Sequence, residues 1–296
     1  MPHGGVMKKR SASVILGGVL VLLSALCYAW MPVLAKIAYG AGLEPHSVLI
    51  LRYLFTLIIL LVFLRLWGEV NFNLSPYLIA QGIFFTAGGL FFFYSLKSIN
   101  AGLSIIIFFS HPVIISLIAV VFLREKLSWF HAAGLIAATA GILLISLSGG
   151  EDVRVNSSGV ALSMASSLCY SFYSLLSERN TRSMGSASIT AAMALIGLIT
   201  VIPLFYDRLG FIMSLSSEQV FIVLAMSFIS TMLAVIFFLE GVKRLGAPRA
   251  SIAGMAEPVF VALIAYLLLG EVLTFTEGAG SLMILAGVGI SILSRR

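Results

Sequence analysis

Charged side chains are scarce in this sequence, and their scarcity excludes a water-soluble fold. Only 18 Lys or Arg and 12 Asp or Glu residues occur among 296, whereas 60% of the residues are hydrophobic. A surface that faces water needs more polar side chains than this, but a surface that faces lipid needs few. The composition therefore indicates an all-α polytopic membrane protein, with room for about ten spans of roughly 20 residues.

Cysteine, histidine and catalytic motifs are also sparse, and each absence removes a class of function. Cys27 and Cys169 fall in apolar segments, so a disulfide or metal cluster is not expected. His3, His46 and His131 lie at predicted termini or loops, too scattered in sequence to indicate a metal site. We find no P-loop, metal-ligand spacing or nucleophile elbow, and therefore expect neither enzymatic activity nor a cofactor. The net charge of +6 lies mainly at predicted span ends, which indicates membrane topology and not nucleic-acid binding.

Apolar runs bounded by charged or turn residues predict ten spans, five on each side of a polar stretch at 151–154. The first run follows three basic residues, like a signal peptide, but it is interpreted as a retained span because a copy of it recurs mid-chain. The predicted spans are 14–35, 47–66, 76–96, 102–123 and 129–147, then 159–176, 187–206, 219–241, 250–269 and 275–293.

The two groups of spans repeat one another. Pro112 and Pro258 are 146 residues apart, and so are Glu125 and Glu271. The same separation relates two pairs of glycines in the last spans, Gly134 with Gly280 and Gly141 with Gly287. In the first spans, residues 24–28 match residues 166–170 at a separation of 142. Because each repeat holds an odd number of spans, the second repeat must enter the membrane from the opposite side, an arrangement used in alternating access. The expected divisions are an N-terminal segment at 1–13, repeats at 14–148 and 159–296, and a linker at 149–158.

The basic residues predict the orientation of the chain. If the N-terminus is inside, the inner segments hold thirteen Lys or Arg residues and the outer segments hold four, with Arg52 left within a span. Inner loops of membrane proteins carry such an excess. We therefore expect a multi-pass protein of the inner (plasma) membrane, with both termini and residues 1–13 in the cytoplasm and the linker outside.

Few ionisable residues fall inside the predicted spans, where a charge costs at least ~2.5–3.5 kcal/mol at the span centre. Arg52 lies in the second span and could bind a carboxylate or phosphate through its fixed fork of donors. The alternatives are that it reaches the outer interface or pairs with Glu44. His111 and Glu257 occupy equivalent places in the two repeats, each directly before a proline that should kink its helix. Such groups suit a binding site or a proton relay, and the alternative is a packing kink with a satisfied polar neighbour.

Aromatic residues on the first spans of the two repeats supply further candidates. Tyr28, Trp30, Tyr170 and Tyr173 lie deeper than an interfacial belt, where they suit a cavity wall, although a belt remains the alternative. Tyr94 is the repeat equivalent of Glu240, which could instead be an interfacial partner for Lys243 or Arg244.

Several of these residues carry a resemblance to a known family. Glu257-Pro258, followed by an apolar run, Gly270-Glu271 and a glycine-spaced final span, resembles the EamA family of the drug/metabolite transporter superfamily. The first repeat also resembles the pattern of that family, in Trp30 followed by Lys36 and in the run Leu51-Arg52-Tyr53. The resemblance implies ten spans in two inverted five-helix halves, a central cavity open to one side at a time, and secondary transport without a nucleotide.

This chain departs from strict repetition at two places. His111 stands where the second repeat has Glu257, and the position equivalent to Arg52 is Ala194. We therefore expect an asymmetric substrate site, walled by Tyr28, Trp30, Tyr94, His111, Tyr170 and Glu257, with Arg52 as the anion anchor.

The expected function is secondary transport of a small metabolite, an amino acid or a related polar or amphipathic compound, with export favoured over uptake. The alternatives are a lipid-linked flippase and a non-catalytic membrane subunit. The expected partners are a small-molecule substrate and the lipid bilayer, with protons as a candidate coupling ion, and the chain is expected to act as a monomer or homodimer.

Overall fold

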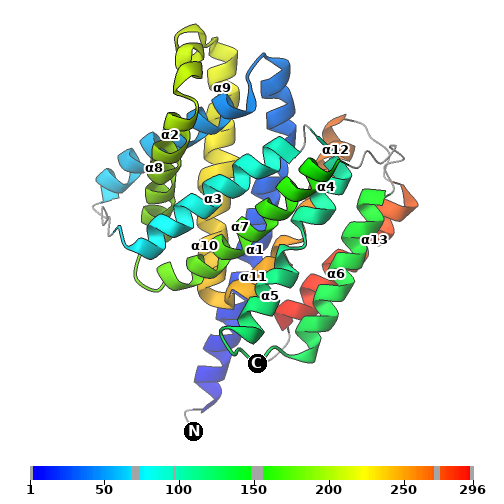
Figure 1. Cartoon of the computed structure of the whole chain (residues 1–296). Coiled ribbons are helices and arrows are strands. Elements are labelled where there is room, and N and C mark those ends of the chain that lie inside the picture. The colour runs from blue at the N-terminus through cyan, green and yellow to red at the C-terminus, as the bar shows by residue number, and fades with distance from the viewer. Residues whose placement is uncertain are drawn as a thin grey trace.

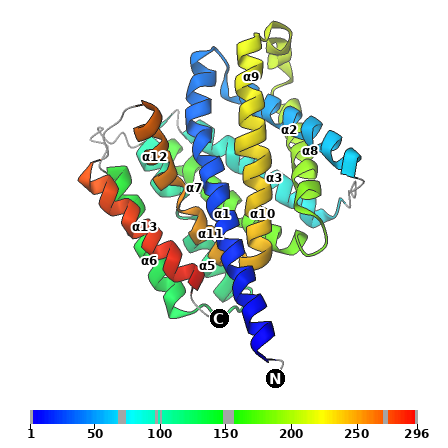
Figure 2. The ribbon, with the colours of Figure 1, turned by 180° about the vertical axis from the view of Figure 1, so that it is seen from behind.

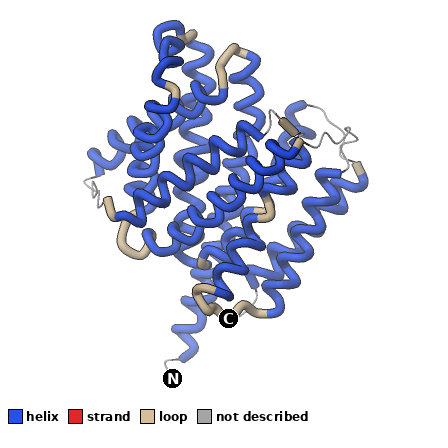
Figure 3. The backbone as a smooth tube through the Cα atoms, viewed as in Figure 1, coloured by secondary structure: helices blue, strands red, loops and turns tan. Residues whose placement is uncertain are grey.

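The computed structural model describes residues 3–67, 74–95, 98–99, 101–147, 156–269 and 274–293, and every element within them is a helix (Figures 1 and 3). Ten helical segments are long and apolar enough to cross a membrane, as the sequence predicts. Glu271, Lys97 and residues 149–155 of the expected linker lie outside the described residues.

The first repeat supplies five of the ten spans and the second supplies the other five. The first contains α1 (His3–Gly40), α2 (Pro45–Trp67), α3 (Pro76–Ser95), α4 (Ala101–Phe108), α5 (His111–Val121) and α6 (Trp129–Leu147). The second contains α7 (Ser157–Asn180), α8 (Ser186–Leu204), η1 (Tyr206–Ser214), α9 (Ser217–Met226), η2 (Ser227–Leu233), α10 (Ala234–Leu245), α11 (Ala247–Gly254), α12 (Glu257–Leu269) and α13 (Phe275–Leu293).

Two spans are broken where proline predicts a kink. The fourth span divides into α4 and α5 just before His111-Pro112, and the ninth divides into α11 and α12 just before Glu257-Pro258. Proline has no amide hydrogen and clashes with the carbonyl one turn earlier, so a continuous helix is disfavoured at both places. The predicted kinks are confirmed, and they take the form of complete interruptions.

The eighth span is continuous but changes its hydrogen-bond pattern. The π-helical segment η2 lies between α9 and α10. Side chains from neighbouring helices bond to carbonyls at its two ends: Thr56 Oγ1 donates to Ser227 O at 3.2 Å, and Ser24 Oγ donates to Ala234 O at 2.7 Å. The first two helices of the chain therefore contact the second half partly through this irregular segment.

The halves pack against each other in reciprocal pairs (Figures 1 and 2). α1 packs on α10 while α3 packs on α7, α2 packs on α8, and α6 packs on α13. Exchanging the two halves turns the α1–α10 pair into the α7–α3 pair, because α7 is the repeat equivalent of α1 and α10 belongs to the equivalent of α3. The α2–α8 and α6–α13 pairs each join equivalent helices, so they are unchanged. Such reciprocity is what a two-fold relation between repeats requires.

Glycines bring α6 and α13 into backbone contact. A Cβ atom on Gly134 would lie 2.6 Å from Gly287 O, and one on Gly280 would lie 2.7 Å from Gly141 O. Gly134, the earlier glycine of α6, therefore faces Gly287, the later glycine of α13. The two helices run antiparallel. Because they end the two repeats, this pairing supports an inverted arrangement of the halves.

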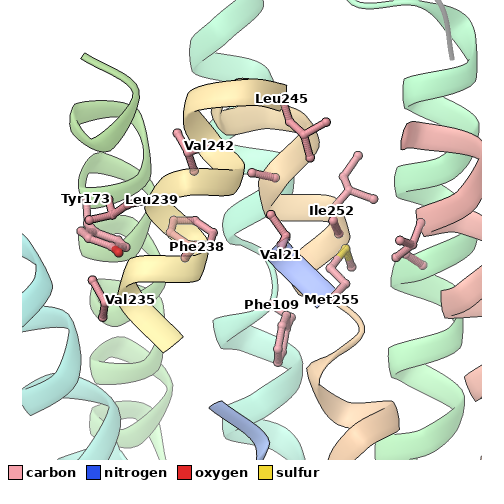
Figure 4. Close-up of a cluster of buried hydrophobic side chains, with 14 of the residues drawn as sticks. Val21, Phe109, Tyr173, Val235, Phe238, Leu239, Val242, Leu245, Ile252 and Met255 are labelled. Atoms are coloured by element: carbon pink, nitrogen blue, oxygen red, sulfur yellow. The ribbon is translucent and has the colours of Figure 1, made fainter. Parts of the chain in front are cut away.

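The largest buried cluster joins the two helix breaks (Figure 4). Phe109 precedes the break in the fourth span and Met255 precedes the break in the ninth, and both belong to a cluster that contains Val21, Tyr173 and Phe238. The interruptions are therefore at the centre of the bundle, surrounded by apolar side chains of α1, α7 and α10.

Candidate functional site

His111 repairs the helix that Pro112 interrupts. Phe108 O would accept a hydrogen bond from residue 112 in a regular helix, but proline cannot donate one. His111 Nδ1 lies 2.9 Å from this oxygen, and because a carbonyl only accepts, Nδ1 must carry the hydrogen. The neutral ring then keeps Nε2 as an acceptor. The side chain is 3% exposed.

An aromatic cluster surrounds His111 and connects the two halves of the chain. The ring of Tyr170 on α7 lies 4.6 Å from the His111 ring, and Phe108 lies 5.0 Å from it. Tyr170 also contacts Tyr173 at 5.2 Å and Phe238 at 6.0 Å, measured between ring centroids. These side chains form a predominantly apolar wall beside the break in the fourth span.

Glu257 stands at the other break without a hydrogen bond or ion pair in the described part of the chain. It is half-buried and interacts electrostatically with Tyr28 and Tyr170. Tyr170 therefore touches His111 and lies within electrostatic range of Glu257, so the two proline breaks share one neighbour.

Arg52 is buried without a carboxylate partner. Arg52 is 2% exposed. Its Nη1 donates a hydrogen bond to Met31 Sδ at 3.4 Å, and its Nε has no hydrogen-bond partner among the described residues. Glu44 Oε2 instead lies 3.7 Å from Nδ1 of His46. Neither alternative from the sequence, exposure at the interface or pairing with Glu44, is found.

Tyr28 on α1 lies within electrostatic range of both Arg52 and Glu257, and also of Tyr170 and Tyr173. Several nearby phenol oxygens are buried without a hydrogen-bond partner in the described residues, those of Tyr28, Tyr39, Tyr53 and Tyr173.

Trp30 and Tyr94 occupy helix positions that differ from those of the aromatic cluster. Trp30 is half-buried and is two positions beyond Tyr28 on α1, so the two side chains leave the helix on different faces. Tyr94 is half-buried at the end of α3, whereas His111 and Glu257 lie at breaks inside their spans. The assignment of Trp30 and Tyr94 to a substrate site remains a prediction from the sequence.

The equivalent of Tyr94 has a structural role. Glu240 forms an ion pair with Arg244 and accepts a hydrogen bond from Ser186 Oγ at 2.8 Å. The interfacial interpretation of Glu240 is therefore confirmed.

His46 and His131 were expected in loops or at termini, and they lie in the first turns of α2 and α6. Both are buried, which the sequence did not indicate. His46 is 6% exposed and stacks on Phe205 at 5.1 Å, while His131 is 2% exposed and its Nε2 lies 3.0 Å from Ser116 Oγ. Their burial depends on packing between elements distant in sequence, which no local pattern reveals.

Tyr53 and Tyr173 are not among the seven predicted site residues, although Tyr173 belongs to the aromatic set on the first spans. Tyr173 follows Tyr170 by three positions and therefore shares its helix face, a signal that the sequence did contain. Tyr53 directly follows Arg52, and the Arg52 guanidinium carbon lies 5.2 Å from its ring centroid. Its buried, unpartnered hydroxyl could be found only from the packed structure.

Two cavities open near the ends of the bundle, and neither is lined by the seven predicted site residues. One of about 520 Å³ lies between the turn at Glu125–Ser128 and the turn at Leu245–Arg249. The other, of about 290 Å³, lies between the turn after α1 and the η1 segment. The turns that line the two cavities lie at opposite ends of the molecule in Figure 1.

A family model and the similar curated proteins are all described as transporters. A family model described as the EamA-like transporter family matches residues 15–147 and again 157–293. An "Uncharacterized transporter" of Archaeoglobus fulgidus is 26% identical, and the match covers 86% of this chain and 90% of the relative. The "Uncharacterized inner membrane transporter YicL" of Salmonella typhimurium is 25% identical, covering 99% and 98%. A solved structure with 16% identity superposes with a TM-score of 0.81 over 93% of this chain and 95% of that one, which shows a shared fold.

Proposed function

Because the chain belongs to the EamA-like transporter family, we propose that it is a secondary transporter for a small zwitterionic metabolite of the amino-acid class, carried by alternating access. The observation that carries this proposal is Arg52, which is buried and has no carboxylate partner among the described residues, while Glu257 at the break in the ninth span has no cationic partner among them. A transported zwitterion would supply both missing partners.

A substrate carboxylate suits the environment of Arg52. A buried cation is costly unless it is paired, and a guanidinium binds a carboxylate through two parallel hydrogen bonds. The Nε donor, which has no partner in the described structure, is one of the donors available for such a bond. Glu257 is of the right sign to receive the substrate ammonium group.

The aromatic cluster favours an apolar substrate side chain. Phe108, Tyr170, Tyr173 and Phe238 are in contact around His111 and between α4, α7 and α10. Rings of this kind accept aliphatic and aromatic groups better than charged ones. L-Leucine is therefore a suitable test compound, together with isopentylamine, which lacks its carboxylate, and 4-methylpentanoate, which lacks its ammonium group.

The broken spans supply points at which half-helices can tilt. α5 and α12 each begin at a proline break, and both breaks touch the same buried cluster. Rocking of the halves about this cluster would expose the Arg52–Glu257 region to one side at a time. Protons are a candidate coupling ion because His111 and Glu257 can each change charge.

Export from the cytoplasm across the inner (plasma) membrane is the favoured direction, with both termini inside. The turns at the end where α1 begins hold Arg124, Lys126 and Arg249, whereas the opposite end holds Arg208, in line with an inner excess of basic residues. A C-terminal fusion to a reporter that is active only in the cytoplasm should be active. Activity of a reporter that requires the outer compartment would contradict this orientation.

A thermal-shift measurement on purified protein tests the substrate class. A ligand that binds the folded state raises its apparent melting temperature. L-Leucine is expected to give a concentration-dependent rise, and isopentylamine and 4-methylpentanoate smaller rises at equal concentration. If either analogue stabilises the protein as strongly as leucine does, the requirement for both charges is wrong.

A further inference from the structure

The smaller cavity lies at the end of the bundle opposite the start of α1 (Figure 1). Its walls come from the turn between α1 and α2, from η1, and from the first residues of α9. Its volume of about 290 Å³ equals the share of about ten water molecules, at about 30 Å³ each. A small amino acid fits such a space with water to spare.

This cavity carries charges of both signs. Glu44 and Arg208 both line it, and His46 completes its set of titratable or charged side chains. His46 is held in place because its ring stacks on Phe205 at an interplanar angle of 16° and meets Phe211 edge-on at 6.2 Å. Glu44 Oε2 lies 3.7 Å from His46 Nδ1. A carboxylate and a guanidinium in one small cavity match the two charges of a zwitterion.

The cavity and Arg52 are both on α2. Ser47 lines the cavity, and Arg52 is five residues further along α2, about 7.5 Å along the axis at 1.5 Å per residue. An apolar cluster that includes Leu51 and Val48 lies between them. Phe211 and Leu215 belong both to the cavity wall and to this cluster, so a movement of the η1 segment would change both together.

The second repeat lacks these charges at the equivalent positions. With the separation of 142 that relates the first spans, Glu44 corresponds to Ser186 and His46 corresponds to Ser188. Ser186 Oγ is engaged by Glu240 at 2.8 Å. The cavity is therefore a feature of one face of the molecule, without a symmetric copy at these positions.

We propose that this cavity is an outer recognition site for zwitterions, in which Glu44 binds the ammonium group and Arg208 binds the carboxylate before or after passage past Arg52. The inference rests on the proposed transport of zwitterions and adds to it a second site on one face. Loss of either charge should weaken recognition at the outer face alone, because Glu44 and Arg208 line only the cavity at that end, whereas the cavity at the other end is lined by different residues.

Transport kinetics in membrane vesicles of opposite orientation test this site. L-Leucine flux is measured in right-side-out vesicles, which present the outer face, and in everted vesicles, which present the inner face. Glu44→Gln and Arg208→Gln are each expected to raise the half-saturating leucine concentration about fivefold at the outer face, the effect of losing one exposed ion pair, and to leave the inner face unchanged. Glu218→Gln, which removes an exposed carboxylate at the start of α9, is the matched control and should change neither face.

The analogues separate the two roles. Competition by 4-methylpentanoate at the outer face should weaken in Arg208→Gln and persist in Glu44→Gln, and isopentylamine should show the reverse. If both variants match the wild type, or change both faces equally, while Arg52→Gln impairs flux, the outer site is wrong and the proposed function stands. If the wild type shows no saturable leucine flux, the proposed function fails and this inference fails with it.

Discussion

Arg52 is a permanent cation in an apolar interior, where it donates a hydrogen bond to the thioether of Met31 and lies against the ring of Tyr53. The sequence identified it from its position in a span, because a charge there is costly unless it has a function. The structure adds that the residue is 2% exposed and that Glu44 is engaged elsewhere. This combination favours an external anion as the partner.

Replacing the guanidinium should therefore affect binding of carboxylate-bearing compounds. Arg52→Gln is expected to weaken L-leucine binding at least about tenfold, the factor that corresponds to losing a charge-assisted hydrogen bond of about 1.5 kcal/mol. Isopentylamine, which lacks a carboxylate, should bind as before. Isothermal titration or thermal-shift titration measures both ligands.

A matched control lies on the same helix. Arg65→Gln removes an exposed arginine near the end of α2 and should leave both affinities unchanged. An equal loss of amine and amino-acid binding in Arg52→Gln would show that the variant disturbs the site generally and would refute the anion-anchor role.

His111 has a structural hydrogen bond that can be separated from any role in proton transfer. His111→Ala leaves Phe108 O without its donor, and a buried unpaired carbonyl costs about 1–3 kcal/mol, so the melting temperature should fall. His111→Asn retains a side-chain donor but cannot titrate, so it should recover most of the stability. Thermal unfolding and the pH dependence of leucine flux are the two measurements.

The comparison of these variants distinguishes the interpretations of the histidine. If Asn restores stability while the pH profile changes, His111 takes part in proton coupling. If Asn restores both stability and the pH profile, the side chain serves only to repair the helix, and the relay hypothesis for His111 is excluded.

At the scale of helices, the sequence predicted most of the architecture. The spans at 129–147 and 275–293 have the boundaries that the structure shows, because hydrophobic length and turn residues determine both. The two interruptions were also predictable, since proline acts locally on its own helix.

The π-helical segment η2 and the 3₁₀ segment η1 were not predicted. Ser227–Leu233 is apolar apart from its hydroxyls and has no proline or glycine, so nothing local marks a change of hydrogen-bond pattern. Bonds from Thr56 and Ser24, which are distant in sequence, satisfy carbonyls at its ends. Similarly, Tyr206–Ser214 was expected to belong to a connection after the seventh span, and its folding over the α1–α2 turn depends on tertiary packing.

Close packing of α6 and α13 leads to a prediction at this scale. A Cβ atom on Gly287 would lie 2.8 Å from the Ala138 nitrogen, so Gly287→Ala should force the helices apart and cost about 1–3 kcal/mol. Gly289 is two residues further on the same helix, and a Cβ atom there meets nothing within 4 Å.

Gly289→Ala is therefore the control. It should be neutral or stabilising by up to about 1 kcal/mol, since alanine favours helix more than glycine does. Thermal unfolding of the two variants in detergent compares them directly. Equal melting temperatures would contradict the glycine-mediated contact between the repeats.

The whole molecule combines a symmetric frame with an asymmetric centre. Reciprocal pairing of α1 with α10 and of α3 with α7 follows the internal repeat, which the constant separation of prolines and glutamates revealed. Arg52, His111 and Glu257 break the repetition, and they were found from sequence because each is chemically unusual in a span. Their common neighbours Tyr28 and Tyr170 show how distant helices bring these residues to one region.

Counterflow of labelled L-leucine into proteoliposomes tests the central claim, that the buried cation and carboxylate select a zwitterion for transport. Vesicles preloaded with unlabelled leucine should transiently accumulate the label above its external concentration, and external leucine should compete more strongly than either isopentylamine or 4-methylpentanoate. Absence of counterflow, or equal competition by either singly charged analogue, would contradict the account.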